Sequence, residues 1–122
     1  MATVLIPRPA ASDHAPYYNT YVQVVPEGDV IPLLERQGRE TVALLRSIGE
    51  EKSHHRYAAG KWTIREVVGH VSDAERVFTY RALSFARGDK NPLPSFDENA
   101  WAAESNAESR SLSELIADFA AV

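Results

Sequence analysis

The sequence predicts an all-α fold, a bundle of amphipathic helices. Apolar residues recur at helical spacing from 30 to 48 and from 64 to 85, which is typical of helices that bury one face. Two capping boxes, at 63–66 and 111–114, mark helix starts, because the hydroxyl and the glutamate of each box accept backbone N–H groups of the first turn. The predicted helices span residues 30–48, 63–87 and 111–122.

The first of these helices follows a proline-rich arm. Residues 1–29 contain Pro7, Pro9 and Pro16 and three tyrosines, so we expect an extended arm whose tyrosine rings lie over the bundle. Asp29 is the expected N-cap of the helix at 30–48, and Gly49 its C-terminal stop. The face expected to lie in the core comprises Val30, Ile31, Leu33, Leu34, Leu44, Leu45 and Ile48.

The second helix begins at the capping box Thr63-Ile64-Arg65-Glu66 and should stop at Gly88. A long polar loop follows over 88–110, with Phe96 and Trp101 as its expected apolar anchors and a short helical turn near residues 98–103 as an alternative. A connection of this length is uncommon unless it is functional. The core-facing half of the helix should comprise Ile64, Val67, Val68, Val71, Ala74, Val77, Phe78, Ala82 and Phe85.

The third helix begins at Ser111 and reaches Val122 without a stop signal. Three helices, the last of them cut, cannot complete a four-helix bundle, because each of the four helices must supply an apolar face to the core. We therefore expect residues 1–122 to form a single domain that is an incomplete bundle. A chain of 122 residues is long enough for one domain with a genuine core.

Composition excludes several classes of protein. The chain has 13 Lys and Arg against 17 Asp and Glu, a net charge of -4, and no basic stripe, which argues against a nucleic-acid partner. It has no cysteine, so a transition-metal site must use imidazole, carboxylate and water. No apolar run reaches the roughly 20 residues of a membrane span, and no signal peptide is evident. We expect a cytoplasmic protein without a membrane partner.

His70 is the residue that we consider for chemistry. It falls toward one edge of the apolar arc of the helix at 63–87, so its imidazole should point into the bundle interior or into a groove between helices. Two interpretations stay open at this point: a core histidine that donates to a carbonyl, or a metal ligand. The residues alone favour the first, because one histidine is not a coordination sphere.

The other polar candidates have simpler interpretations. Glu66 and Asp73 lie one turn either side of His70 and could orient a ligating imidazole, although capping and a solvated surface are favoured for them. Arg81 lies three turns beyond His70, where it could hold an anionic group, although an ion pair with Glu75 or another helix is the commoner outcome. The adjacent His54 and His55, and His14 in the arm, are expected to be solvated.

The stretch from Gly60 to Arg76, Gly-Lys-Trp-Thr-Ile-Arg-Glu-Val-Val-Gly-His-Val-Ser-Asp-Ala-Glu-Arg, resembles the DinB-like superfamily of four-helix-bundle proteins. The likeness extends to Tyr-x-x-Tyr-Val and Gly-Asp-Val within residues 18–30 and to Pro-Ser-Phe-Asp-Glu-Asn-Ala-Trp at 94–101, and covers most of residues 17–119. The resemblance implies an up-down-down-up bundle. It also implies that His70 is the first of three ligands of a divalent metal, nickel or zinc, which reverses the preference drawn from the residues alone.

One departure from that family concerns the other two ligands. The resemblance implies a His-x-x-x-His pair on a late helix, but no histidine follows His70 in these 122 residues. We therefore expect the chain to be a fragment of a protein about 40 to 60 residues longer, a length that comes from the family's bundle. On this interpretation the metal site is incomplete in the chain.

The resemblance implies a function similar to that of thiol-dependent transferases and maleylpyruvate isomerases. In that mechanism a low-molecular-weight thiol binds an open metal position, and the metal lowers its pKa so that the thiolate attacks a small electrophilic substrate. The alternative is a non-catalytic, stress-associated bundle that acts in dimerisation or small-ligand binding. In either case the resemblance favours a homodimer, and direct action on DNA is poorly supported by the acidic charge balance.

Overall fold

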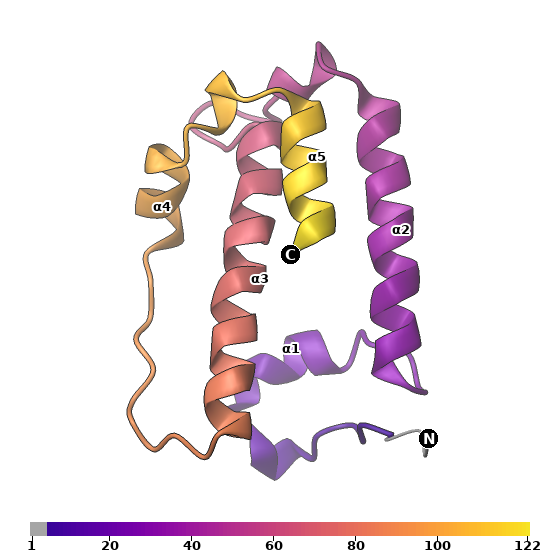
Figure 1. Cartoon of the computed structure of the whole chain (residues 1–122), viewed down its shortest axis with the longest axis vertical. Coiled ribbons are helices and arrows are strands. Elements are labelled where there is room, and N and C mark those ends of the chain that lie inside the picture. Colours follow the sequence, from indigo (N-terminus) through magenta and orange to yellow (C-terminus); the bar gives the residue numbers. More distant parts are fainter. Residues whose placement is uncertain (1–4) are drawn as a thin grey trace. The chain divides into compact units, whose positions relative to one another are not determined.

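The computed structural model of the chain describes residues 5–122, and all regular secondary structure in that range is helical (Figure 1). The all-α prediction is confirmed. Within the same range, no helix is both long enough and apolar enough to cross a bilayer. The α-helices are α1 (Asn19–Val22), α2 (Val30–Ile48), α3 (Ile64–Ala86), α4 (Glu98–Glu104) and α5 (Leu112–Ala121), and the 3-10 turns are η1 (Ala11–Asp13), η2 (Pro16–Tyr18), η3 (Lys52–His54) and η4 (Ala107–Ser109).

The chain divides into two compact units, residues 1–40 and residues 41–122. The expectation of a single domain over 1–122 stays a prediction. The predicted arm at 1–29 is not uniformly extended: residues 1–4 lie outside the described residues, and the segment from 11 to 22 forms η1, η2 and α1. Pro16 favours this turn because its ring fixes φ near the helical value at the start of η2.

The guanidinium of Arg8 holds the arm in its folded form. It donates to the carbonyl oxygens of Val22, at 2.6 Å, and Val25, at 2.5 Å, and its Nε lies 3.0 Å from a carboxylate oxygen of Glu27. The three tyrosines are exposed, and the Tyr17 ring contacts the Tyr18 and Tyr21 rings edge to face. Aromatic rings prefer this arrangement because the positive ring edge meets the negative face of the next ring.

α2 has the predicted bounds, but three residues of its predicted core face are exposed. The Asp29 carboxylate accepts the N–H of Ile31 at 3.1 Å, and Gly49 follows the helix with φ of 80°, a conformation that glycine adopts without strain. Leu45 is buried, whereas Ile31, Leu34 and Leu44 are 47%, 53% and 62% exposed. The prediction was wrong for these three: Ile31 and Leu34 precede the last turns of α2, which contribute to the core, and in those turns Val42, Leu45 and Ile48, not Leu44, face it.

α3 begins and ends where the sequence predicts, within one residue. The Thr63 hydroxyl accepts the Glu66 N–H at 3.2 Å, and the Glu66 carboxylate accepts the Thr63 N–H at 2.8 Å. Its buried line consists of Arg65, Val68 and Ser72, spaced i, i+3 and i+7. α5, α4 and η4 all pack against α3 (Figure 1).

Val68 and Ile64 of the predicted apolar stripe on α3 contribute to the core, but other members of the stripe face away from that packing. Val67, Val71, Phe78 and Phe85 are 44%, 37%, 56% and 72% exposed, so the prediction was wrong for them in this chain. The physical reason is that α5 and η4 cover a neighbouring line of residues on α3, which consists of Arg65, Val68 and Ser72. At 3.6 residues per turn, successive residues differ by about 100°, which is enough to exchange a buried face for an exposed one.

The core of this unit is small and lies where α2, α3 and α5 meet. The second half of the long loop predicted for 88–110 is helical: Asp97 caps α4 by accepting the N–H groups of Asn99 and Ala100 at 3.0 Å each, and η4 precedes α5. The alternative of a short helical turn in the loop is therefore confirmed. The buried core residues are Leu45, Val68, Ala107, Leu112, Leu115 and Ile116, with Val42, Ile48, Ile64 and Phe119 packed against them.

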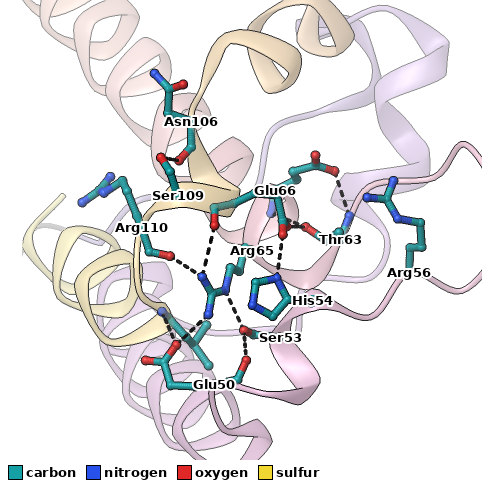
Figure 2. Close-up of polar contacts among 12 residues, drawn as sticks. Glu50, Ser53, His54, Arg56, Thr63, Arg65, Glu66, Asn106, Ser109 and Arg110 are labelled. Atoms are coloured by element: carbon teal, nitrogen blue, oxygen red, sulfur yellow. Dashed lines mark hydrogen bonds and ion pairs between the residues drawn. The ribbon is translucent and has the colours of Figure 1, made fainter.

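A polar cluster closes the end of the unit where α2 ends and where α3 and α5 begin (Figure 2). The buried Arg65 guanidinium is its centre: Nε donates to Ser53 Oγ at 2.7 Å, Nη1 to the Arg110 carbonyl at 2.5 Å, and Nη2 to Glu50 Oε2 at 2.8 Å. The Glu50 carboxylate in turn accepts the first two N–H groups of α5, from Leu112 at 2.8 Å and Ser113 at 3.1 Å. Among the described residues, every buried side-chain nitrogen and oxygen has a partner.

Replacing Arg65 with methionine should destabilise the chain strongly. The change leaves Ser53 and the Arg110 carbonyl without their donor, and hydrogen bonds of charged groups contribute roughly 1.5–3 kcal/mol each. We expect a loss of about 2–3 kcal/mol in urea unfolding followed by circular dichroism. The matched control is R39M, at an exposed arginine of α2. A loss no larger in R65M than in R39M would contradict the central position of Arg65.

Acid should weaken the same cluster through Glu50. The N–H groups of Leu112 and Ser113, followed by the charge of Arg65, hold the pKa of Glu50 below its ordinary value of 4.5. A lowered carboxyl pKa stabilises the fold fully above pH 4.5 and loses that contribution as pH falls through the folded value. Glu50→Gln should therefore lower stability at pH 7 and flatten the fall in stability below pH 5, compared with Glu51→Gln. Parallel pH profiles for both variants would disprove this role.

Candidate functional site

His70 lies on the second turn of α3, on a different face from the buried line of Arg65, Val68 and Ser72. Its side chain is half-buried, so it is neither free in solvent nor sealed in the core. The capping box at Thr63 fixes the start of α3 and thereby the direction in which His70 leaves the helix.

The Trp62 indole is the aromatic neighbour of His70. The two ring centroids are 4.8 Å apart and the ring planes meet at 47°. Trp62 directly precedes the N-cap Thr63, so the capping box also positions this indole. No described residue makes a hydrogen bond with either ring nitrogen of His70, and the structure thus does not show the carbonyl partner expected of a core histidine. The imidazole is oriented by packing and keeps its nitrogen lone pair available.

Glu66 and Asp73 have partners other than His70. Glu66 is committed to the capping box, in which its carboxylate accepts the Thr63 N–H. Asp73 is half-buried, with one carboxylate oxygen 3.6 Å from Nη1 of Arg76. The interpretations favoured for both residues, helix capping and a position on the polar helix surface, agree with these contacts.

Arg81 does not form the ion pair that we considered the commoner outcome. Its Nη2 donates to the Pro94 carbonyl at 2.8 Å, and its guanidinium carbon lies 5.8 Å from the centre of the Phe78 ring. Within the described part of the chain, no carboxylate, including that of Glu75, lies within ion-pair distance of it. Arg81 therefore retains an unpaired positive charge beside the segment at 93–96.

The remaining histidines do not converge on His70 or on one another. Nδ1 of His54 lies 2.7 Å from Oε2 of Glu108. The other carboxylate oxygen of Glu108, Oε1, accepts a hydrogen bond from the Thr63 hydroxyl. Burial opposes the charged form of Glu108, but the hydrogen bonds from Thr63 and His54 outweigh it, so the Glu108 pKa is lowered. His54 and His55 are exposed, as expected of a solvated loop pair, but the carboxylate partner of His54 was not predicted. Nδ1 of His14 contacts the Ala15 carbonyl at 2.9 Å.

The donor set in residues 5–122 does not complete a metal site. No group of three or more His, Cys, Asp or Glu side chains in this range is arranged to hold a metal ion. The free imidazole nitrogens of His70 fit the chemistry of a single ligand, whereas catalytic zinc sites generally use three protein ligands. We therefore derive no catalytic step through a metal from these residues.

Sequence reasoning missed two features of this region. The Trp62 contact with His70 had a usable signal, because an aromatic residue just before an N-cap often packs back on the helix that follows. The cluster around Arg65 had a weaker signal, the spacing of Arg65, Val68 and Ser72 on one face, which places an arginine in line with core positions. Its partners Ser53 and Glu50 lie in a polar connection that gave no sequence signal.

The helical fold and the half-buried His70 imidazole, packed on Trp62, are those of a helical protein with one candidate metal ligand. Residues 33–122 match the sequence profile of the DinB superfamily. The matched range is most of the chain and includes α3, α4, α5 and His70. The chain therefore belongs to the DinB superfamily, as its resemblance to that family predicted.

A curated relative carries the name "Putative metal-dependent hydrolase" and comes from Oceanobacillus iheyensis. It is 33% identical over 61 residues, which are 49% of this chain and 35% of the relative. The match thus spans about a third of the relative's length, and the relative is the longer protein. No solved structure matches the chain significantly.

Proposed function

We propose that this protein is a divalent-metal-dependent enzyme of the DinB superfamily and that His70 is one of its metal ligands. The observation that carries the proposal is the His70 imidazole itself, half-buried, packed on Trp62 and without a hydrogen-bond partner among residues 5–122. A neutral imidazole held in this way has a lone pair ready for a metal ion, and a packed ring loses little further freedom on binding.

We propose that further ligands lie outside the described residues. Residues 5–122 contain no group of three or more His, Cys, Asp or Glu side chains that could hold a metal ion. The longer relative with its metal-dependent name supports this proposal, because the region that it shares with this chain is only 35% of its length. We propose nickel or zinc, since imidazole suits both ions and the chain has no cysteine.

The proposed chemistry is attack by a metal-activated nucleophile on a small electrophilic substrate. A divalent ion with an open position lowers the pKa of a bound water or thiol, so hydrolysis and thiol transfer are related activities of one kind of site. The name of the relative points to hydrolysis, and the resemblance of the block at 60–76 points to thiol transfer. The two can be separated by assaying the loaded protein with and without a low-molecular-weight thiol.

Metal analysis of the full-length protein tests whether His70 is a metal ligand. We expect the wild-type protein to hold a divalent ion, and His70→Ala to bind it at least tenfold more weakly, because even residues that only orient a ligand contribute about 10- to 100-fold. The measurement is metal content by mass spectrometry, followed by competition with a chelator.

The control for this experiment is His55→Ala, at an exposed histidine of the connection before α3. It should keep the wild-type metal content and affinity. Full metal occupancy in H70A would show that His70 is not a ligand, and a wild-type protein that binds no divalent ion would eliminate the metalloenzyme proposal.

A further inference from the structure

A groove lies between α3 and the segment that leads into α4, and neither the family nor the metal proposal accounts for it. It encloses about 380 Å³, within the usual range for small-molecule sites. Its floor is the face of α3 that carries Val77, Tyr80 and Arg81, and its far wall is formed by Leu93, Phe96 and Trp101. All of these residues belong to the unit at 41–122.

The far wall of the groove is an aromatic surface. The Phe96 and Trp101 rings have their centroids 4.6 Å apart with planes at 36°, so they pack as a pair. Asp97 caps α4 between them and fixes where Trp101 leaves the helix. Although Phe96 is half-buried, Trp101 remains 45% exposed, which leaves indole surface available to a ligand. A planar apolar group gains contact area against such a wall at little entropic cost.

The charge that lines the groove favours an anion. Arg76, Arg81 and Asp73 are its charged residues, so the lining carries one net positive charge. Asp73 lies 3.6 Å from Arg76, whose other nitrogen lies 2.6 Å from Asp118, so Arg76 is neutralised by carboxylates. The Arg81 guanidinium uses one donor on the Pro94 carbonyl and has no carboxylate partner among the described residues. Most of its five N–H donors remain available to a carboxylate.

We propose that this groove binds a small aromatic carboxylate, with the ring against Phe96 and Trp101 and the carboxylate on Arg81. The groove offers a half-buried unpaired guanidinium at one wall and an exposed aromatic face at the other, and this ligand class satisfies both. A guanidinium binds a carboxylate through two parallel N–H bonds, which a neutral amide cannot reproduce. The site would hold the ligand whether or not a metal is bound at His70.

A titration of the full chain with 3-phenylpropanoate tests the proposal, at neutral pH with excess chelator so that no metal contributes. The two indole N–H resonances in a proton–nitrogen correlation spectrum distinguish the groove from the His70 region, because Trp101 lines the groove and Trp62 does not. We expect the Trp101 signal to shift in a saturable manner and the Trp62 signal to stay in place. Neutral 3-phenylpropanamide should bind at least fivefold more weakly, and propanoate should not saturate.

Variants at Arg81 separate binding from support of the groove. Arg81→Gln should weaken binding of 3-phenylpropanoate about tenfold and leave binding of the amide unchanged, since only the carboxylate forms charge-assisted hydrogen bonds with the guanidinium. Arg81→Lys keeps the charge and should lose less affinity than R81Q. The matched control is Arg87→Gln, at an exposed arginine beyond the end of α3, which should bind as the wild type does.

Several outcomes would overturn the proposal. These are a Trp101 signal that does not shift in the wild type, equal affinity for the amide and the carboxylate, and unchanged affinity in R81Q. Equal loss of both ligands in R81Q and R81K would also overturn it, because it would show that Arg81 only supports the groove through Pro94. None of these results bears on His70, so this test and the metal measurement fail independently.

Discussion

The rest of the unit at 41–122 depends on one buried charge, the Arg65 guanidinium in the first turn of α3. From α3 it reaches two other segments: the turn after α2, through Glu50 and Ser53, and the chain before α5, through Arg110 (Figure 2). A buried guanidinium is costly unless its donors are satisfied, and here each nitrogen has an acceptor. The acceptors must therefore stay in place, which ties the three segments together at one end of the core.

The same cluster positions both candidate sites through α3. Glu50 caps α5 while it binds Arg65, so the start of α5 and the start of α3 are fixed with respect to each other. The capping box then directs Trp62 and His70, and farther along α3 the face with Tyr80 and Arg81 forms one wall of the groove. The two sites use different stretches of one helix. We therefore expect a substitution in one site to leave binding at the other unchanged.

Local signals in the sequence predicted the helices well, whereas the buried faces were predicted poorly. Capping residues and glycine stops act within a few residues, and α2 and α3 accordingly lie within one residue of their predicted bounds. Burial depends on which neighbour covers a face, and the line at Arg65, Val68 and Ser72 was covered instead of the more apolar line at Val67 and Phe78. Only a partner that is distant in the chain decides between two such lines.

The candidate site was predictable to the extent that it is local to α3. His70 was identified from a motif on one helix, but its contact with Trp62 and the absence of a hydrogen-bond partner among the described residues are tertiary facts. The sequence offered Arg81 as a candidate for an anion, which stays a prediction, and the groove that Arg81 lines forms only because the loop at 93–96 packs against α3. The pairing of His54 with Glu108 joins residues 54 positions apart, which no local pattern encodes.

Hydrogen exchange of the arginine side chains tests most directly whether the buried Arg65 guanidinium holds these segments together. Nε of Arg65 donates to the fully buried hydroxyl of Ser53, and we expect its N–H resonance to be resolved at neutral pH and to exchange far more slowly than that of any exposed arginine. Exchange of the Arg65 N–H at the rate of exposed Arg39 would show that the guanidinium is solvated and that the cluster does not hold the three segments together.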